Sequence, residues 1–110
     1  MILAGRSTDT GEVSDSLNAL VRTYNPATGA GAANRGRFSN EHVDTLIEAA
    51  QGTIDPAQRA ELLAQASVLA IAEGAIIPIH HPVRTWALRK GLTYKARADE
   101  FTLGMGVAGP

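Results

Sequence analysis

The most regular pattern of apolar and polar residues lies between residues 39 and 52. Four apolar residues recur there at the spacing i, i+3, i+4 and i+7: Val43, Leu46, Ile47 and Ala50. This spacing is typical of the buried face of an amphipathic helix. Ser39 or Asn40 can cap its first turn, and Gly52 supplies a stop at its end. The pattern therefore predicts a helix that starts just after residue 40.

A second helical pattern follows directly. Asp55 suits the N-cap position, and Pro56 suits the first helical position, where its missing N–H costs nothing. Its stripe consists of Leu62, Ala66, Leu69 and Glu73, and Leu63 and Ala70 flank it. Gly74 can end this helix. Because only a short turn separates the two helices, we expect them to pack side by side in one layer.

A shorter helix is predicted nearer the N-terminus. Ser14 is its expected N-cap, and Asp15 lies in its first turn, where the helix dipole favours negative charge. Its apolar stripe consists of Val13, Leu17, Leu20 and Val21. The helix should end before Asn25, which Pro26 follows. Residues 25–38 are rich in Gly, Ala and Asn without periodicity, which indicates a loop, and loops of that length are usually functional or mobile.

The pattern changes after Gly74 to runs typical of strands. Residues 75–79 are almost continuously apolar, as in a strand buried on both faces, whereas residues 83–88 alternate. Pro78 and Pro82 cannot donate to a ladder, which favours strand ends or a chain that passes between elements. A third, weaker strand is indicated around Phe101–Leu103.

Bulk properties restrict the function classes. The chain has 110 residues, one small domain's worth, with ten Lys and Arg against eleven Asp and Glu. This balance gives no electrostatic reason to bind nucleic acid or anionic lipid. Cysteine is absent, and no apolar run is long enough for an export signal or a membrane span. Residues 2–5 resemble the end of a buried strand whose entry nothing explains, so we expect chain upstream.

Adjacent histidines raise the question of a metal site. His80 and His81 point to opposite faces if the chain is extended, so they could not chelate one ion together. His42, the only other histidine, lies on a predicted helix surface. We therefore expect solvated or hydrogen-bonded histidines and no bound metal.

Other candidate chemistry is weak. No serine lies in a G-x-S-x-G elbow, and the glycines at 29, 31 and 36 lack the G-K-[ST] of a phosphate loop. No catalytic residue is predicted. Asp9 follows a predicted strand end, where it could bind a ligand or cap local N–H groups. Trp86 could pack in a core or line a cleft, and periodicity leaves both readings open.

Three segments together resemble the C-terminal portion of the peptide-type (family 5) extracellular solute-binding proteins of bacterial ABC transporters. They read GRFSNEHVDTLIEAA (36–50), DPAQRAELLAQASVLAIAEGAIIPIHHPVRTWALRKGLTY (55–94) and RADEFTLGMGV (97–107). The residues that match the family's motifs are Arg37, Ser39, Asn40, Val43, Asp44, Leu46, Ile47, Ile76, Ile77, Pro78, Trp86, Ala87, Arg89, Lys90 and Gly91. Their order and spacing carry the resemblance, which covers nearly the whole chain.

The resemblance implies an α/β fold, the C-terminal part of a two-lobed periplasmic-binding-protein type II-like architecture with a helical hairpin and a few strands. Residues 1–74 would form the end of one lobe, and residues 75–110 would cross back toward the other. It implies capture of peptides or similar small solutes for import, an ABC permease as partner of the full-length parent, and a periplasmic or cell-surface location. It implies no cofactor, no catalysis and no membrane span in the chain itself.

The stretch AGRSTDTGEVSDSLNALV (4–21) resembles the part of the family that faces the ligand in the cleft between the lobes. The aspartate that binds the ligand's α-amino group in peptide-binding members would fall on Asp9, and Arg6, Thr8 and Thr10 would lie beside it. A carboxylate in a closed cleft is a sound anchor for an ammonium group, because charge-assisted hydrogen bonds strengthen away from water. Most of that cleft would lie outside these 110 residues, so we expect weak ligand binding or none.

Two alternatives come from other classes. One is a small stand-alone α/β interaction module, which would need apolar surface left over after its own packing. The other is an enzyme, which would need titratable residues gathered in a pocket, and the sequence offers no such group at a recognisable spacing.

Overall fold

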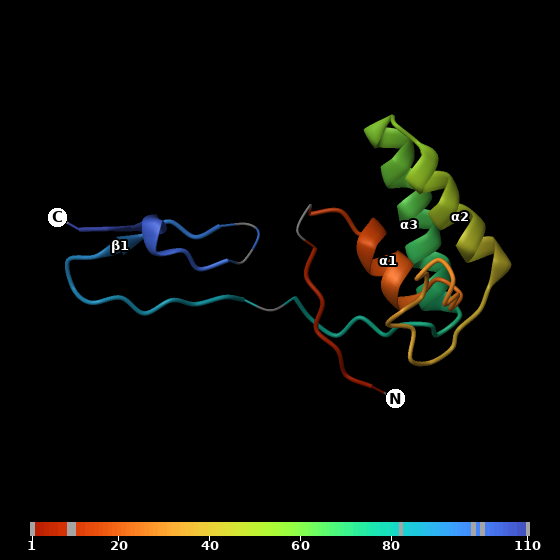
Figure 1. Cartoon of the computed structure of the whole chain (residues 1–110), viewed down its shortest axis with the longest axis horizontal. Coiled ribbons are helices and arrows are strands. Elements are labelled where there is room, and N and C mark those ends of the chain that lie inside the picture. Colours follow the sequence, from red (N-terminus) through yellow and green to blue (C-terminus); the bar gives the residue numbers. More distant parts are fainter. Residues whose placement is uncertain (1, 9–10, 82, 98, 100, 110) are drawn as a thin grey trace.

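The structure is a computed structural model that describes residues 2–8, 11–81, 83–97, 99 and 101–109. In this part of the chain the elements are α1 (Ser14–Leu20), α2 (Glu41–Gly52), α3 (Pro56–Ala72), β1 (Thr93–Tyr94), a 3-10 helix (Gly104–Gly106) and β2 (Val107–Ala108). The protein is therefore a small mixed helix and strand structure, with three helices and a two-stranded sheet among the described residues (Figure 1).

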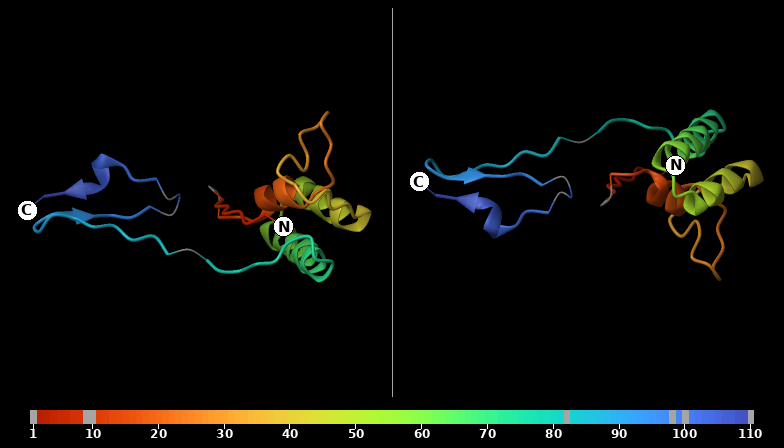
Figure 2. Two further views of the ribbon diagram at one scale, coloured as in Figure 1. Left: turned by 90° about the horizontal axis from the view of Figure 1, so that it is seen from below. Right: turned by 90° about the horizontal axis from the view of Figure 1, so that it is seen from above.

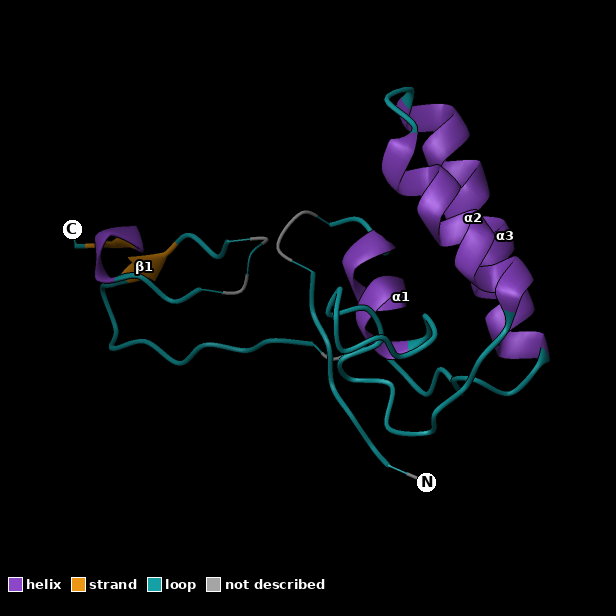
Figure 3. Cartoon of the chain, turned by 45° about the vertical axis from the view of Figure 1, so that its right-hand side comes forward, coloured by secondary structure: helices purple, strands orange, loops and turns teal. Residues whose placement is uncertain are grey.

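The two long helices, α2 and α3, lie side by side and α1 packs against them (Figure 3). Their shared core consists of Leu17, Val21, Val43, Ile47, Ala50, Leu63, Ala66 and Ala70. Small residues on the facing sides allow a close approach of the two long helices, and Val43 and Ile47 are fully buried between them. The predicted pair of helices in one layer is confirmed.

Side-chain caps set the starts of the two long helices as predicted. Asn40 Oδ1 accepts the N–H groups of His42 and Val43 at 2.8 and 3.1 Å. Asp55 Oδ1 accepts the N–H of Gln58 at 2.8 Å. Each cap satisfies N–H groups that have no partner inside the helix.

The start of α1 differs from the prediction that Ser14 is its N-cap. Val13 occupies the N-cap position and Ser14 is the first helical residue. The Ser14 hydroxyl donates instead to Glu12 Oε2 at 2.9 Å. The hydroxyl therefore serves the preceding segment, and α1 begins without a side-chain cap.

The loop of residues 25–38 has little regular structure, as predicted, but hydrogen bonds hold it in place. Asn34 is almost fully buried, and its Nδ2 donates to the carbonyl oxygens of Phe38 at 2.7 Å and Arg22 at 3.1 Å. Its Oδ1 accepts the N–H of Phe38 at 3.1 Å. One side chain thus ties the C-terminal end of the loop to the residues that follow α1.

Beyond Gly74 the chain leaves the helical layer and runs extended (Figure 2). We call residues 75–109 the arm. The strands predicted at 75–79, 83–88 and 101–103 are wrong, and residues 2–5 are also outside any strand. The ladder in the described chain pairs Thr93 with Ala108 and Tyr94 with Val107. Within the described ranges these extended runs have no neighbouring strand, and a strand exists only where a neighbour accepts and donates the ladder bonds.

The arm makes the molecule elongated. The radius of gyration is 17.5 Å and the extents are 56 × 35 × 27 Å. A compact domain of this length would have a radius of gyration of about 13 Å. The helical layer holds the core, while the arm projects from it with most of its side chains exposed.

Candidate functional site

The predicted ligand-binding residues lie in the segment that leads into α1. Asp9 and Thr10 lie outside the described residues, whereas Arg6 and Thr8 are described. The Arg6 guanidinium forms an ion pair with Asp15 in the first turn of α1, and both side chains are partly exposed. The structure therefore places Arg6 against a carboxylate of its own chain.

A turn follows in the same segment. The carbonyl of Thr8 accepts the N–H of Gly11 at 3.4 Å, and Gly11 has a φ of 72°. Thr8 is half-buried.

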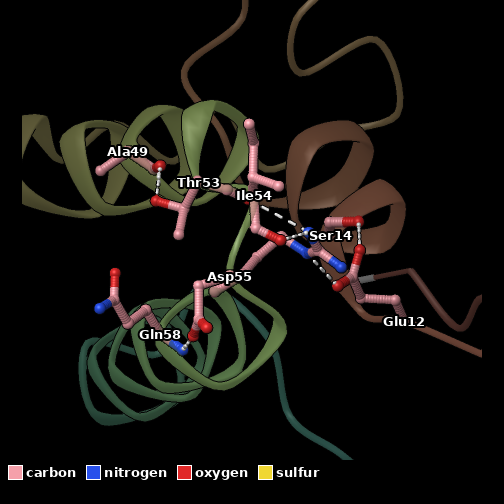
Figure 4. A network of polar contacts seen from close by, with 8 residues as sticks. Glu12, Ser14, Ala49, Thr53, Ile54, Asp55 and Gln58 are labelled. Atoms are coloured by element: carbon pink, nitrogen blue, oxygen red, sulfur yellow. Dashed lines mark hydrogen bonds and ion pairs between the residues drawn. The ribbon is translucent and has the colours of Figure 1, made fainter.

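Glu12 is the centre of a polar network at the base of this segment (Figure 4). Arg59 Nε donates to Glu12 Oε1 at 2.6 Å, and the Ser14 hydroxyl donates to the other carboxylate oxygen. The hydrogen bond from Arg59, with a smaller contribution from Ser14, lowers the pKa of Glu12 below its usual value. Glu12 is thus an anion held by two donors.

Arg59 also reaches the turn between α2 and α3. Its Nη1 donates to the carbonyl oxygens of Thr53 at 3.1 Å and Ile54 at 3.4 Å. Thr53 itself donates its hydroxyl to Ala49 in the last turn of α2, as Figure 4 shows. One guanidinium therefore connects three parts of the chain: the segment before α1, the interhelical turn and the first turns of α3.

The contacts of Glu12 suit a carboxylate that positions the chain better than one that transfers a proton. A general acid or base works best with a pKa near the operating pH, and the pKa of Glu12 is moved in the opposite direction. The network ties Glu12, just before α1, to α3 and to the interhelical turn.

The histidines do not come together. His80 and His81 are exposed in the arm, while His42 lies on the exposed side of α2. In the part of the chain that the structure covers, no three His, Cys, Asp or Glu side chains are placed to hold a metal ion.

Trp86 packs within the arm. Its ring centroid lies 5.5 Å from that of Tyr94, and its Nε1 donates to the Thr102 hydroxyl at 3.1 Å. The Tyr94 hydroxyl donates to the carbonyl of Phe101 at 3.2 Å. A Cβ on Gly106 would lie 2.9 Å from the Tyr94 ring, so the glycine admits the ring. Trp86 thus contacts Tyr94 in the arm and is not part of the helical core, so core packing is not confirmed and cleft lining stays a prediction.

The described surface has open depressions on both the helical layer and the arm. One, of about 390 Å³, lies between α2 and α3 and is lined by His42, Leu46, Gln65, Val68, Leu69 and Ala72; we call it the α2/α3 groove. The other, of about 540 Å³, lies on the arm and is lined by Lys95, Ala96, Arg97, Asp99, Leu103, Met105 and Gly106. Neither is lined by Arg6 or Thr8, so neither adjoins the described part of the predicted ligand-binding segment.

Two residues that line the second depression form an ion pair. Arg97 Nε donates to both carboxylate oxygens of Asp99, at 2.9 and 3.0 Å. This hydrogen bonding lowers the pKa of Asp99 and raises that of Arg97. Each charge is thus compensated by a neighbour two residues away.

Sequence reasoning missed the two residues that organise the segments around the helical layer, Arg59 and Asn34. Arg59 reads as an ordinary exposed arginine on a helix, and its partner Glu12 is 47 residues away. Asn34 reads as a loop residue. The only sequence signals for these two residues are the charge of Arg59 and the amide of Asn34, both at positions outside the apolar pattern.

Comparisons with protein-family models, with curated proteins and with solved structures give no match to this chain. Among the described residues no helix combines the length and the apolar character that crossing a membrane requires.

Proposed function

We propose that this chain is part of a solute-binding protein that supplies peptides or similar small solutes to an ABC transporter. The observation that carries the proposal is the order of the elements: a capped helical hairpin, α2 and α3, and then an extended segment that leaves the helical layer at Gly74. A segment that crosses between two lobes would follow this course. The motif order from residue 36 to residue 107 supports the same reading.

In this proposal the segment before α1 faces the solute. Asp9 binds the α-amino group of a peptide, and Arg6, Thr8 and Thr10 line the same side of the cleft. The contact of Glu12 with Arg59 supports this role, because it anchors the segment to the helical layer two residues before α1 begins. An ABC permease is the partner, and the periplasm or the cell surface is the location.

The proposal is tested first on the gene. We expect the reading frame to encode further chain on the N-terminal side, and permease and ATPase genes to lie beside it. Neighbouring genes unrelated to transport, with nothing similar to a solute-binding protein upstream, would contradict the proposal.

The second test uses the product of the whole reading frame in calorimetric titrations with di- to tetrapeptides. Asp9→Asn should weaken binding at least tenfold, because a neutral amide loses the charge-assisted bond to the ammonium group. Asp55→Asn is the matched control, since asparagine caps a helix as well as aspartate does. Equal affinities of the Asp9 variant and the parent would remove Asp9 from the site.

A second candidate is an interaction module. It is favoured by the exposed apolar side chains of the arm, of which Ile77, Ile79 and Val83 are each at least 70% exposed. Apolar surface left over after a chain's own packing is what an interaction module needs.

A further inference from the structure

Charge is distributed unevenly between the arm and the rest of the chain. Residues 75–109 contain five Lys and Arg against two Asp and Glu, whereas residues 1–74 contain five against nine. The near-neutral balance of the whole sequence therefore conceals a positive arm and a negative helical layer. A charge that is confined to one end of the molecule can attract a partner that the net charge would not.

Three cations of the arm, Arg89, Lys90 and Lys95, form no ion pair with any described residue. They flank β1. Arg89 and Lys90 begin the turn before this strand, where the Leu92 N–H donates to the carbonyl of Arg89 at 3.0 Å, and Lys95 directly follows the strand. All three side chains are exposed. The short stretch around β1 therefore carries uncompensated positive charge at the surface.

Exposed apolar side chains lie beside these charges. Met105 is 89% exposed and lines the depression on the arm together with Lys95. Phe101 is 60% exposed, and its carbonyl accepts the hydroxyl of Tyr94 in β1. The Lys95 N–H donates to the carbonyl of Gly106 at 3.0 Å, which holds the segment that contains Met105 against the end of β1. Cations and apolar side chains thus share one surface of the arm.

The shape of the molecule separates this surface from the negative charges. β1 lies at the opposite end of the molecule from α2 and α3 (Figure 1), and the longest extent is 56 Å. The Debye length at physiological ionic strength is about 8 Å. A negatively charged surface that meets the end of the arm therefore interacts with its cations, while the carboxylates of α2 and α3 are screened.

We propose that the part of the arm around β1 binds the surface of an anionic lipid bilayer. Arg89, Lys90 and Lys95 contact lipid phosphates, and Phe101 and Met105 enter the headgroup region. Interfacial binding combines these two contributions, electrostatic attraction to anionic lipid and burial of apolar side chains. Nucleic acid would use the cations but would leave the apolar side chains exposed. The inference concerns the 110-residue chain itself and does not depend on the transport function.

Cosedimentation of the 110-residue chain with lipid vesicles measures the binding. The partition coefficient on vesicles of equal parts phosphatidylglycerol and phosphatidylcholine should be at least tenfold higher than on pure phosphatidylcholine. It should fall in 1 M salt, where the Debye length is only about 3 Å. Trp86 is the only tryptophan and lies in the arm, so its emission should shift to shorter wavelength when anionic vesicles are added.

Variants locate the binding surface. Arg89→Gln should weaken binding to the anionic vesicles about fivefold, the contribution of one cation near such a bilayer. Met105→Asp should weaken it at least tenfold, because it removes an apolar contact and adds a negative charge. Arg35→Gln is the matched control: it makes the same change of charge at an exposed arginine of the helical layer, and should bind like the parent. All three side chains are exposed, so circular dichroism melts should match those of the parent.

Three results would overturn the proposal. The first is equal partition of the parent on the two kinds of vesicle. The second is an equal loss of affinity in Arg89→Gln and Arg35→Gln, which would show that binding follows the net charge and not the arm. The third is tighter binding to duplex DNA than to anionic vesicles at the same phosphate concentration, which would assign the cations to nucleic acid.

Discussion

Arg59 and Glu12 join α3 to the segment that precedes α1: Arg59 Nε donates to Glu12 Oε1 at 2.6 Å across 47 residues of sequence. The same guanidinium binds two carbonyl oxygens of the interhelical turn. The exit of the N-terminal segment from the helical layer is therefore determined by a contact outside the apolar core.

This contact predicts a pH dependence of stability. Arg59 lowers the pKa of Glu12 in the folded state, so the folded state binds this proton less readily than the unfolded chain does. The contribution of Glu12 is present above the usual glutamate pKa of 4.5 and is lost as the pH falls through the lowered value. Urea unfolding of the parent and of Glu12→Gln should show a small difference in free energy at pH 7 that shrinks on acidification.

The control for this measurement is Arg59→Gln. In that background, the effect of Glu12→Gln on the free energy of unfolding should be smaller than in the parent, because the hydrogen bond from Ser14 remains. A difference between parent and Glu12→Gln that grows as the pH falls would show that the carboxylate destabilises the fold.

Gly31 is predicted to tolerate no side chain. Its φ is 62°, and a Cβ there would lie 2.3 Å from the carbonyl oxygen of Arg22. Gly31→Ala should destabilise the fold by more than about 2 kcal/mol, because the clash adds to the cost of a left-handed alanine. Gly29→Ala is the control: it has a similar φ of 75° but open space around the Cβ, and should cost only about 1 kcal/mol. Equal unfolding midpoints of the two variants would contradict the close approach at Gly31.

The helical layer was predictable from the sequence because its determinants are local. Apolar spacing, Asn40, Asp55 and Pro56 all act within a few residues of the element they define. The arm was not predictable in this way. Its β-branched and aromatic residues fit a strand, but a ladder requires a neighbour, and no local pattern says whether a neighbour is present.

The predicted binding segment shows the same difference between what local sequence determines and what it does not. The position of a polar segment before α1 followed from the sequence, whereas its contacts did not. Arg6 pairs with Asp15 and Glu12 with Arg59, and both partners were visible only as charges on helices. Side-chain pairing over such distances depends on how the helices pack, which the apolar pattern determines only in outline.

The core is small enough that one truncation should have a large effect. Ile47 is fully buried between α2 and α3, and Ile47→Ala should cost about 2–5 kcal/mol through lost apolar contact and the cavity left behind. Ile54, in the interhelical turn, is 92% exposed, and Ile54→Ala should change stability by less than about 0.5 kcal/mol. Chemical unfolding followed by circular dichroism compares the two. Similar losses would show that the core does not lie where the structure places it.

Asn40 performs two tasks that substitutions can separate. Its Oδ1 caps α2, and its Nδ2 donates to Glu73 Oε2 at 2.7 Å at the end of α3. Asn40→Ala removes both contacts and should destabilise the fold by about 1 kcal/mol or more. Asn40→Asp keeps the capping acceptor but sets a second carboxylate against Glu73. Its deficit should therefore diminish when Glu73→Gln is added, because glutamine can donate to the new carboxylate. Thermal unfolding of the two single variants and the double variant measures this coupling. Strictly additive losses would show that the contact between the two helix ends contributes nothing to the fold.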